Sequence, residues 1–153
     1  MQTLRLLFLL LCSVALTLQA QYEYEVTTLL PQGSGQIDDG LCVDDKGVLY
    51  GSLIGNWPGA AGTHILRYRP DGKIDSLVTG MTRPNGISYH NGSIYAANSE
   101  RGEVWMIDTA GQSSILTSLP GISNVIGVPG TDSLIAVSWA RNTVFGINAQ
   151  GVV

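Results

Sequence analysis

A short pattern occurs three times in this chain and constrains its fold more than any other feature. Each copy reads as a turn, a short apolar strand, a tight hairpin, further strands and an exit that ends in glycine. The three copies open at 39–43, 85–89 and 124–128, and their exits are Asp71-Gly72, Ala110-Gly111 and Gln150-Gly151. The exits recur about every 40 residues, which is the period of four-stranded propeller blades. The sequence therefore predicts a β-propeller.

Alternating apolar and polar residues, punctuated by Gly, Pro, Asn and Asp, predict strands and no helix of convincing length. The first group of expected strands is 41–44, 48–53, 64–69 and 73–78. The second group is 86–89, 93–97, 102–108 and 112–117. The third group has 125–128, 133–138 and 143–148, without a clear fourth strand. The expected fold is all-β, an incomplete propeller of about three four-stranded antiparallel blades at roughly 37–80, 81–121 and 122–153.

Three blades are too few for a closed ring, because propellers use about four to eight. An open arc exposes apolar faces and strand edges at both of its ends. Two explanations follow from the sequence. The chain is the N-terminal portion of a longer propeller or a truncated reading frame, with further blades elsewhere, or it self-associates with other chains to close the ring.

The N-terminus has the pattern of a secretory signal peptide over residues 1–20. Arg5 precedes an apolar stretch from Leu6 to Leu18, and Ala20 supplies a small residue for cleavage. The stretch is shorter than the about 20 apolar residues of a membrane-spanning helix. We expect an exported protein, secreted or periplasmic, with no membrane association after the leader is removed. Residues 21–36 are expected to form an N-terminal strand and linker.

Cysteine usage predicts no internal disulfide. Cys12 lies inside the predicted leader, which leaves Cys42 as the one cysteine of the mature chain. Its place in an apolar strand predicts a buried and inert thiol, with a reactive thiol as the alternative.

The charge balance excludes one class of partner. Only 13% of residues are charged and the formal net charge is −4, so no basic surface is expected for the phosphates of a nucleic acid. The expected partner is a small molecule or a protein.

The repeat resembles the six-bladed propellers of the SMP-30/gluconolactonase-like family and the related NHL-repeat proteins. The resemblance runs from about residue 37 onward and is carried by Asp39-Gly40-Leu41-Cys42-Val43-Asp44 with Gly47-Val48-Leu49-Tyr50, Arg83-Pro84-Asn85-Gly86-Ile87 with Ser93-Ile94-Tyr95-Ala96-Ala97-Asn98, and Gly102-Glu103-Val104-Trp105-Met106-Ile107-Asp108. It implies the fold, but it leaves the function open, because the same repeat serves hydrolases and binding modules.

Three polar residues stand at the same phase of the three repeats, immediately before the expected innermost strands: Asp39, Asn85 and Asn124. We expect them to point toward one end of the central channel. Their oxygens are of the kind that Ca²⁺ or Mg²⁺ binds. The resemblance implies that Asp39 and Asn85 hold a divalent cation that polarises a lactone carbonyl and activates water, with Asn124 as a further candidate. The alternative is ordinary turn chemistry.

The metal set is incomplete on this chain, because the glutamate ligand that the resemblance implies in the first blade has no counterpart here. No catalytic residue is identified. The sequence contains no Gly-x-Ser-x-Gly elbow, no His-Glu-x-x-His, no phosphate loop and no cysteine pair.

The first blade carries an inserted loop at 55–63 on the face of the expected channel mouth. Asn56 and Trp57 are candidate ligand-binding residues, because an exposed tryptophan on a glycine-rich loop suits a lid or a platform for stacking a sugar. The alternative is a tryptophan folded over its own blade. The other large aromatic residues are expected to pack between blades: Tyr50, Tyr95, Trp105, Trp139 and Phe145.

Two functional classes remain. The first is an exported propeller that binds a protein, a sugar or another small ligand through its loops. The second is a metal-dependent lactonase-like hydrolase whose remaining site residues lie outside this chain. The incomplete ligand set favours the binding module.

Overall fold

The computed structural model describes residues 37–56, 58–148 and 150–151. The predicted signal peptide at 1–20 and the predicted strand and linker at 21–36 lie outside this part of the chain. The described residues are all-β, and none of them belongs to a helix that is long and apolar enough to cross a membrane.

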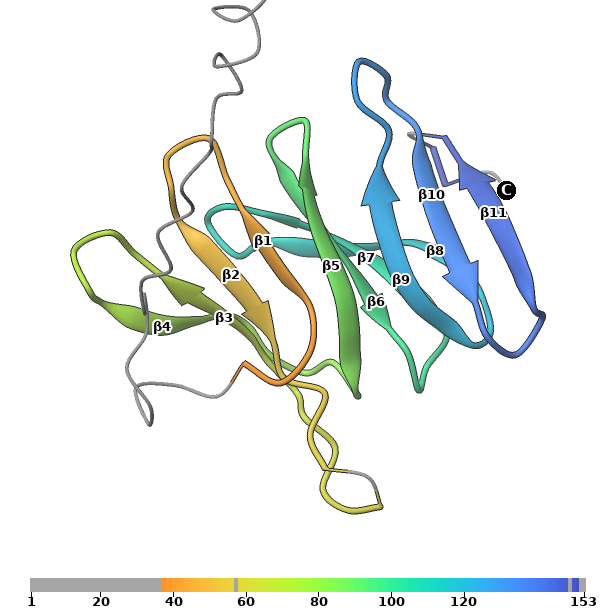
Figure 1. Ribbon diagram of the computed structural model, residues 1–153, viewed down its shortest axis with the longest axis horizontal. Coiled ribbons are helices and arrows are strands. Elements are labelled where there is room, and N and C mark those ends of the chain that lie inside the picture. Colours follow the sequence, from red (N-terminus) through yellow and green to blue (C-terminus); the bar gives the residue numbers. More distant parts are fainter. Residues whose placement is uncertain (1–36, 57, 149, 152–153) are drawn as a thin grey trace, which may run out of the picture. The chain divides into compact units, whose positions relative to one another are not determined.

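Within the described residues, eleven strands form three antiparallel sheets, and strands that are adjacent in a sheet are consecutive in the sequence (Figure 1). The first sheet contains β1 (Leu41–Val43), β2 (Leu49–Ser52), β3 (Ile65–Tyr68) and β4 (Ile74–Val78). The second contains β5 (Pro84–His90), β6 (Ser93–Asn98), β7 (Glu103–Asp108) and β8 (Ser113–Ser118). The third contains β9 (Ile122–Gly127), β10 (Leu134–Ser138) and β11 (Thr143–Ile147). The expected strands and their grouping are confirmed, and within the described residues the third sheet has three strands.

The first strands of the three sheets, β1, β5 and β9, lie next to one another. This arrangement places two apolar cores between the sheets. One core lies between the first and second sheets and contains Tyr50, Ile65, Leu77, Met81, Ile87, Ile94, Ala96 and Ile107. The other lies between the second and third sheets and contains Ala97, Val104, Leu119, Ile122, Val125, Leu134, Ala136 and Ile147.

Strand β6 shows why the sequence alternates as it does. Ala96 belongs to the core toward the first sheet, and the next residue, Ala97, belongs to the core toward the third sheet. Successive side chains of a strand point to opposite faces, so the middle sheet is buried on both faces. The second sheet therefore has one face toward the first sheet and one toward the third.

The turns follow the expected local chemistry. Asn91 and Gly92 connect β5 to β6 with φ of 47° and 81°, the left-handed values that a two-residue hairpin requires. The β1–β2 turn is organised by Asp44, whose Oδ1 accepts hydrogen bonds from the backbone N–H groups of Lys46 and Val48, both at 2.9 Å. Its Oδ2 accepts a bond of 3.0 Å from the buried hydroxyl of Tyr50. This carboxylate therefore joins the turn to the core.

Cys42 is partly buried against the first core. Burial, and then the negative charge of Asp44, raise the pKa of its thiol to about 12. Because the thiolate is the nucleophile, we expect no measurable alkylation by iodoacetamide at pH 7.5 in a chain carrying Cys12→Ser, and full alkylation of the same chain in urea. Mass spectrometry distinguishes the two. Alkylation of the folded chain at the rate of free cysteine would contradict the prediction.

Candidate functional site

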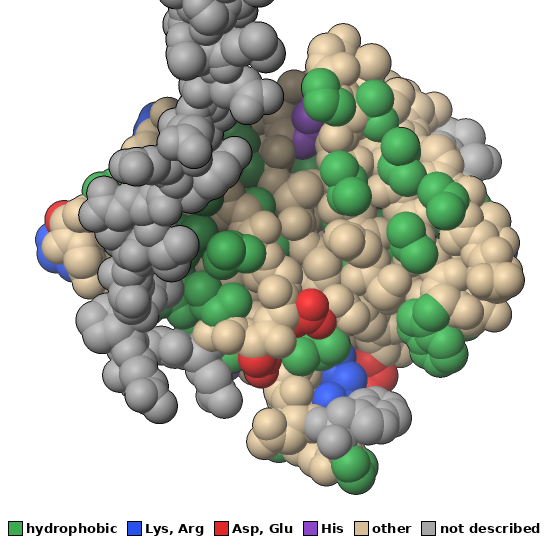
Figure 2. Space-filling view, in the orientation of Figure 1, with side chains coloured by type: hydrophobic (Ala, Val, Ile, Leu, Met, Phe, Trp, Pro, Cys, Tyr) green, Lys and Arg blue, Asp and Glu red, His purple; other side chains and the backbone are tan. Residues whose placement is uncertain are grey.

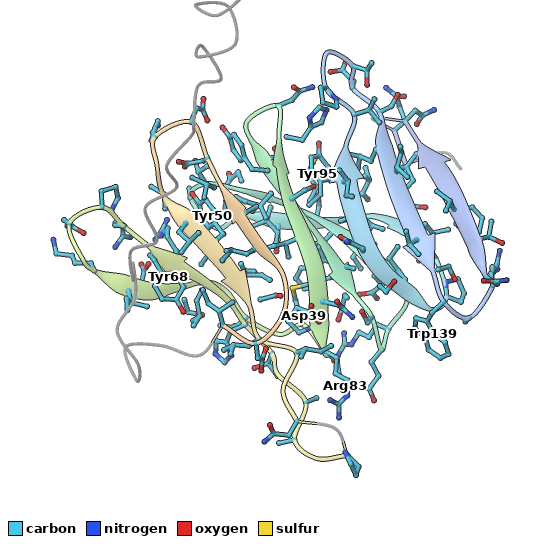
Figure 3. All side chains as sticks on the ribbon, in the orientation of Figure 1. Asp39, Tyr50, Tyr68, Arg83, Tyr95 and Trp139 are labelled. Atoms are coloured by element: carbon cyan, nitrogen blue, oxygen red, sulfur yellow. The ribbon has the colours of Figure 1, made fainter. Side chains whose placement is uncertain are left out.

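The predicted site residues gather at one end of the sheets, which we call the channel mouth. The segments that precede β1, β5 and β9 lie there, as do the segments that follow β2, β6 and β10, because an antiparallel neighbour ends where its partner begins. Figure 3 shows Asp39, Arg83 and Trp139 along this edge of the molecule. Three separate parts of the sequence therefore meet at the channel mouth.

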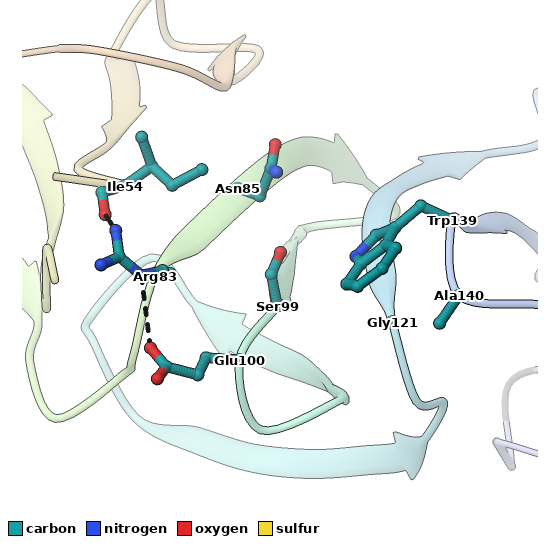
Figure 4. Close-up of a pocket in the computed structure, with 8 residues that line it drawn as sticks. All are labelled: Ile54, Arg83, Asn85, Ser99, Glu100, Gly121, Trp139 and Ala140. Atoms are coloured by element: carbon teal, nitrogen blue, oxygen red, sulfur yellow. Dashed lines mark hydrogen bonds and ion pairs between the residues drawn. The ribbon is translucent and has the colours of Figure 1, made fainter. Parts of the chain in front are cut away.

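A pocket of about 560 Å³ opens at the channel mouth, a size within the range of small-molecule sites. Residues in or next to all three sheets contribute to it, and it is lined by Ile54, Arg83, Asn85, Ser99, Glu100, Gly121, Trp139 and Ala140. Figure 4 shows Trp139 on one side, Ile54 and Arg83 on the other, and Ser99 between them. The pocket combines an apolar wall with a few polar groups.

Arg83 connects the pocket to the inserted loop. Its guanidinium donates hydrogen bonds to the carbonyl oxygens of Asn56 at 3.1 Å and Gly59 at 2.8 Å. The same guanidinium lies 3.4 Å from the Glu100 carboxylate. Its backbone φ is 54°, a left-handed conformation that costs a non-glycine residue about 1–3 kcal/mol. The fold holds Arg83 in this conformation, and Arg83 in turn holds the loop at the mouth of the pocket.

The inserted loop is a short hairpin. Gly55 and Ala61 form an isolated antiparallel bridge, and the Asn56 N–H donates to the Ala60 carbonyl at 3.1 Å. The Asp38 carboxylate fastens the base of this hairpin by accepting bonds of 2.6 and 3.1 Å from the N–H groups of Ile54 and Gly55.

Of the two ligand-binding residues predicted in this loop, Asn56 lines a second pocket, of about 240 Å³, together with Asp38, Thr63 and His64. Trp57 lies outside the described residues. A ligand-binding role for either residue stays a prediction.

Trp139 departs from its predicted position. It was expected to pack between blades, but it is 71% exposed and lines the large pocket. The reason is that Trp139 continues the alternation of β10, in which Ile135 and Val137 are exposed, and its N–H donates to the Gly121 carbonyl at 2.9 Å. The prediction was right for the other aromatic residues: Tyr50 is fully buried, and Tyr95, Trp105 and Phe145 pack against the two cores.

The segments that contain the three predicted metal ligands lie side by side. A Cβ placed on Gly40, next to Asp39, would lie 2.6 Å from the carbonyl oxygen of Asn85. A Cβ placed on Gly86, next to Asn85, would overlap the side-chain amide of Asn124. The two glycines therefore allow neighbouring strands to approach closely at the channel mouth.

The prediction that all three occupy the same phase was wrong for Asn124. The second strands of the three sheets contain matching triplets at 49–51, 94–96 and 134–136. Leu41, Ile87 and Val125 are equivalent, because each pairs with the last residue of its triplet, which is Gly51, Ala96 or Ala136. Asp39 and Asn85 lie two residues before these positions, but Asn124 lies only one before.

The strand starts also differ from the prediction. Strands β5 and β9 begin earlier than expected and contain bulges near their starts, so Asn85 and Asn124 lie within strands. Of the three predicted ligands, Asn85 lines the large pocket.

The electrostatics of the three residues differ. Partial burial, and then the adjacent Asp38 carboxylate, raise the pKa of Asp39 above its usual value. Asn124 uses its Oδ1 locally, accepting a 2.8 Å bond from the N–H of Val125. The described residues contain no group of three or more His, Cys, Asp or Glu side chains that could hold a metal. The predicted set is of a different kind, because two of its three ligands, Asn85 and Asn124, would bind through amide oxygens. Metal binding by Asp39, Asn85 and Asn124 stays a prediction.

Solved structures share this arrangement of sheets. The chain superposes on a chain of the nidogen/laminin complex with a TM-score of 0.65 and 18% identity over 75% of its length, covering 45% of that chain. Virginiamycin B lyase from Staphylococcus aureus gives a TM-score of 0.62 at 15% identity over 74%, covering 39% of that chain. This chain is a partial β-propeller. Its fold is that of the NHL/SMP-30-like propellers, as the sequence predicted.

A gluconolactonase from Xanthomonas campestris is also similar, with a TM-score of 0.57 and 16% identity over 74% of this propeller, covering 44% of that chain. The propeller thus spans less than half the length of each of these three chains. A scan of protein-family models and a search of curated proteins each found no match to the sequence. At these identities the superpositions establish the fold, which hosts both binding and catalytic proteins.

Proposed function

We propose that this propeller is an exported binding protein that takes a small, hydroxyl-rich ring compound, such as a sugar, in the pocket at the channel mouth. The observation that carries the proposal is the exposed indole of Trp139 opposite a set of hydrogen-bonding groups in a pocket of about 560 Å³. Aromatic faces stack well on the apolar faces of sugar rings, while nearby polar groups bind the hydroxyls.

The polar side of the pocket supports a ligand that is uncharged and rich in hydroxyls. The hydroxyl of Ser99 is buried and has no hydrogen-bond partner among the described residues. A buried polar group of this kind gains from a ligand that supplies the missing bond. Arg83 and Glu100 lie 3.4 Å apart and offset each other's charge, so the pocket has no strong preference for an ion of either sign.

The binding proposal predicts a specific loss of affinity. Methyl β-D-glucopyranoside is a suitable probe because it has the ring and cannot hydrolyse as a lactone does. We expect Trp139→Ala to raise its dissociation constant at least about tenfold, equivalent to about 1.4 kcal/mol, through loss of ring stacking. Isothermal titration calorimetry measures the change.

Two variants serve as comparisons. Ile115→Ala removes an exposed apolar side chain on β8, away from the pocket, and should leave the affinity unchanged. Trp57→Ala tests the predicted lid separately. Absence of binding by the unmodified chain to this glucoside and to glucono-1,5-lactone, or equal affinity after Trp139→Ala, would disprove the proposal.

A metal-dependent lactonase-like hydrolase is the second candidate, favoured by the close approach of the Asp39–Gly40 and Asn85–Gly86 segments. Asp39 and Asn85 would hold the divalent cation, and a bound cation would polarise a lactone carbonyl. The Asp38 and Asp39 carboxylates repel each other, and a cation between the strands would relieve that repulsion.

This candidate predicts that Ca²⁺ binding depends on Asp39. Calorimetric titration with CaCl₂ should give heat for the unmodified chain, and Asp39→Ala should weaken binding at least about tenfold by removing the one charged ligand of the predicted set. Asp71→Ala is the control, because Asp71 is exposed in the β3–β4 turn and pairs with Lys73. Equal Ca²⁺ binding by the Asp39→Ala chain, or none by the unmodified chain, would remove the hydrolase candidate.

A further inference from the structure

Two sheet faces of this propeller have no partner in the described structure. The third sheet exposes Ile126, Ile135, Val137 and Val144 by 53%, 42%, 38% and 64%, on the face that points away from the second sheet. We call this the leading face. Figure 2 shows apolar side chains gathered over this part of the molecule.

The first sheet exposes Leu41 and Val43 by 54% and 53%, on the face that points away from the second sheet. We call this the trailing face.

The leading face has the residue pattern of a buried interface. Val137 pairs with Val144 across β10 and β11. The equivalent pair of the second sheet is Ala97 with Val104, and both are fully buried against the third sheet. The equivalent pair of the first sheet is Ser52 with Ile65, both also fully buried. The same positions are thus covered wherever a following sheet is present.

The trailing face matches the other half of the same interface. Leu41 on the first sheet is equivalent to Ile87 on the second and Val125 on the third, by their strand pairing. Ile87 is 6% exposed and Val125 is fully buried, each against the preceding sheet. Leu41 therefore presents the side chain that a preceding sheet covers in the other two repeats.

The two contacts between sheets inside the chain have the same arrangement. In each, the face equivalent to the leading face packs against the face of the next sheet that is equivalent to the trailing face. We propose that two copies of this chain associate head to tail, each placing its leading face on the trailing face of the other, and so close one ring of six blades. Three blades are below the about four to eight that close a ring, and six lie within that range. Two identical contacts related by a twofold axis leave no free face, so assembly stops at two chains.

Sedimentation equilibrium of the full chain at micromolar concentration tests this proposal. The expected mass is twice that of one chain. Ile135→Asp on the leading face and Leu41→Asp on the trailing face should each halve the measured mass, because each substitution places a charge in both contacts of the ring. The matched control is Ile115→Asp. Ile115 is 54% exposed on β8, away from both faces, and this variant should keep the double mass.

A mixture of the two variants adds a positive test. One of its two contacts combines the intact leading face of the Leu41→Asp chain with the intact trailing face of the Ile135→Asp chain. Partial recovery of the double mass in the mixture, with neither variant recovering alone, supports the head-to-tail arrangement. Circular dichroism melting of each variant separates loss of association from loss of folding, since the substituted residues are exposed.

Three results would overturn the proposal. A monomeric unmodified chain would show that the faces do not bind a second copy. A series of masses above two chains would show that the ring does not close. A dimer broken by Ile135→Asp but kept by Leu41→Asp would show that two leading faces pack on each other instead.

Discussion

Replacing Ile94 by aspartate is expected to abolish cooperative folding of the propeller. Ile94 on β6 is fully buried between the first and second sheets. Removing a buried isoleucine costs about 2–5 kcal/mol, and burial of an unpaired carboxylate adds several more. A domain of this size is stable by only about 5–15 kcal/mol, so the two losses together remove most of the free energy of unfolding.

Urea unfolding followed by circular dichroism measures this effect, and Ile115→Asp provides the comparison. The substitution is chemically the same, but Ile115 is 54% exposed on the outer strand of the second sheet. A surface substitution of this kind changes the free energy of unfolding by about 0.5 kcal/mol or less. A chain with Ile94→Asp that unfolds cooperatively at the same urea concentration as the unmodified chain would contradict the assignment of Ile94 to the core between the sheets.

Replacing Asp44 by alanine should lower the free energy of unfolding by about 2–4 kcal/mol, because a buried donor that loses its acceptor costs about 1–3 kcal/mol. Asp44 is 7% exposed, and its carboxylate accepts three hydrogen bonds, from Lys46, Val48 and Tyr50. Loss of the bond from the Tyr50 hydroxyl is expected to contribute most of this cost. Tyr50 is 1% exposed, so water does not replace the carboxylate as the acceptor.

Asp108 offers a matched control in the equivalent place of another hairpin. Its carboxylate accepts from the N–H groups of Ala110 and Gln112, two and four residues later, as Asp44 accepts from Lys46 and Val48. Asp108 is exposed and bonds no buried hydroxyl among the described residues, so Asp108→Ala should cost only about 0.5–1.5 kcal/mol. Equal losses from the two variants would mean that the Tyr50 bond contributes nothing. Tyr50→Phe should then be neutral as well.

The candidate site shows what kind of residue sequence analysis misses. The sequence indicated Arg83 only as part of the repeat, yet it bonds the inserted loop and pairs with Glu100 at the pocket. The signal available in the sequence was its position before Pro84 in a turn, which does not reveal bonds to residues more than 20 positions earlier. Ser99 and Glu100 follow a strand that was predicted correctly, but nothing local indicated that their side chains line a pocket.

The proposed ring also bears on the pocket. The pocket is already lined by residues in or next to all three sheets of one chain, so its lining does not require a second copy. Ligand binding and association are therefore separable. A chain that is monomeric through Leu41→Asp is expected to keep its affinity for the glucoside, whereas Trp139→Ala is expected to lose it without a change in mass.

Local order in the sequence was sufficient to predict the strands, their grouping into three antiparallel sheets and the turns between them. The alternation of apolar and polar residues and the conformational freedom of Asn91-Gly92 act between residues close in the chain. They can therefore be recognised in the sequence. The tertiary structure alone decided three matters: that Asn124 is out of phase with Asp39 and Asn85, that Trp139 faces solvent, and that Arg83 fastens a distant loop. These depend on the register in which strands pair and on how closely separate segments approach, and such contacts join residues that the sequence keeps far apart.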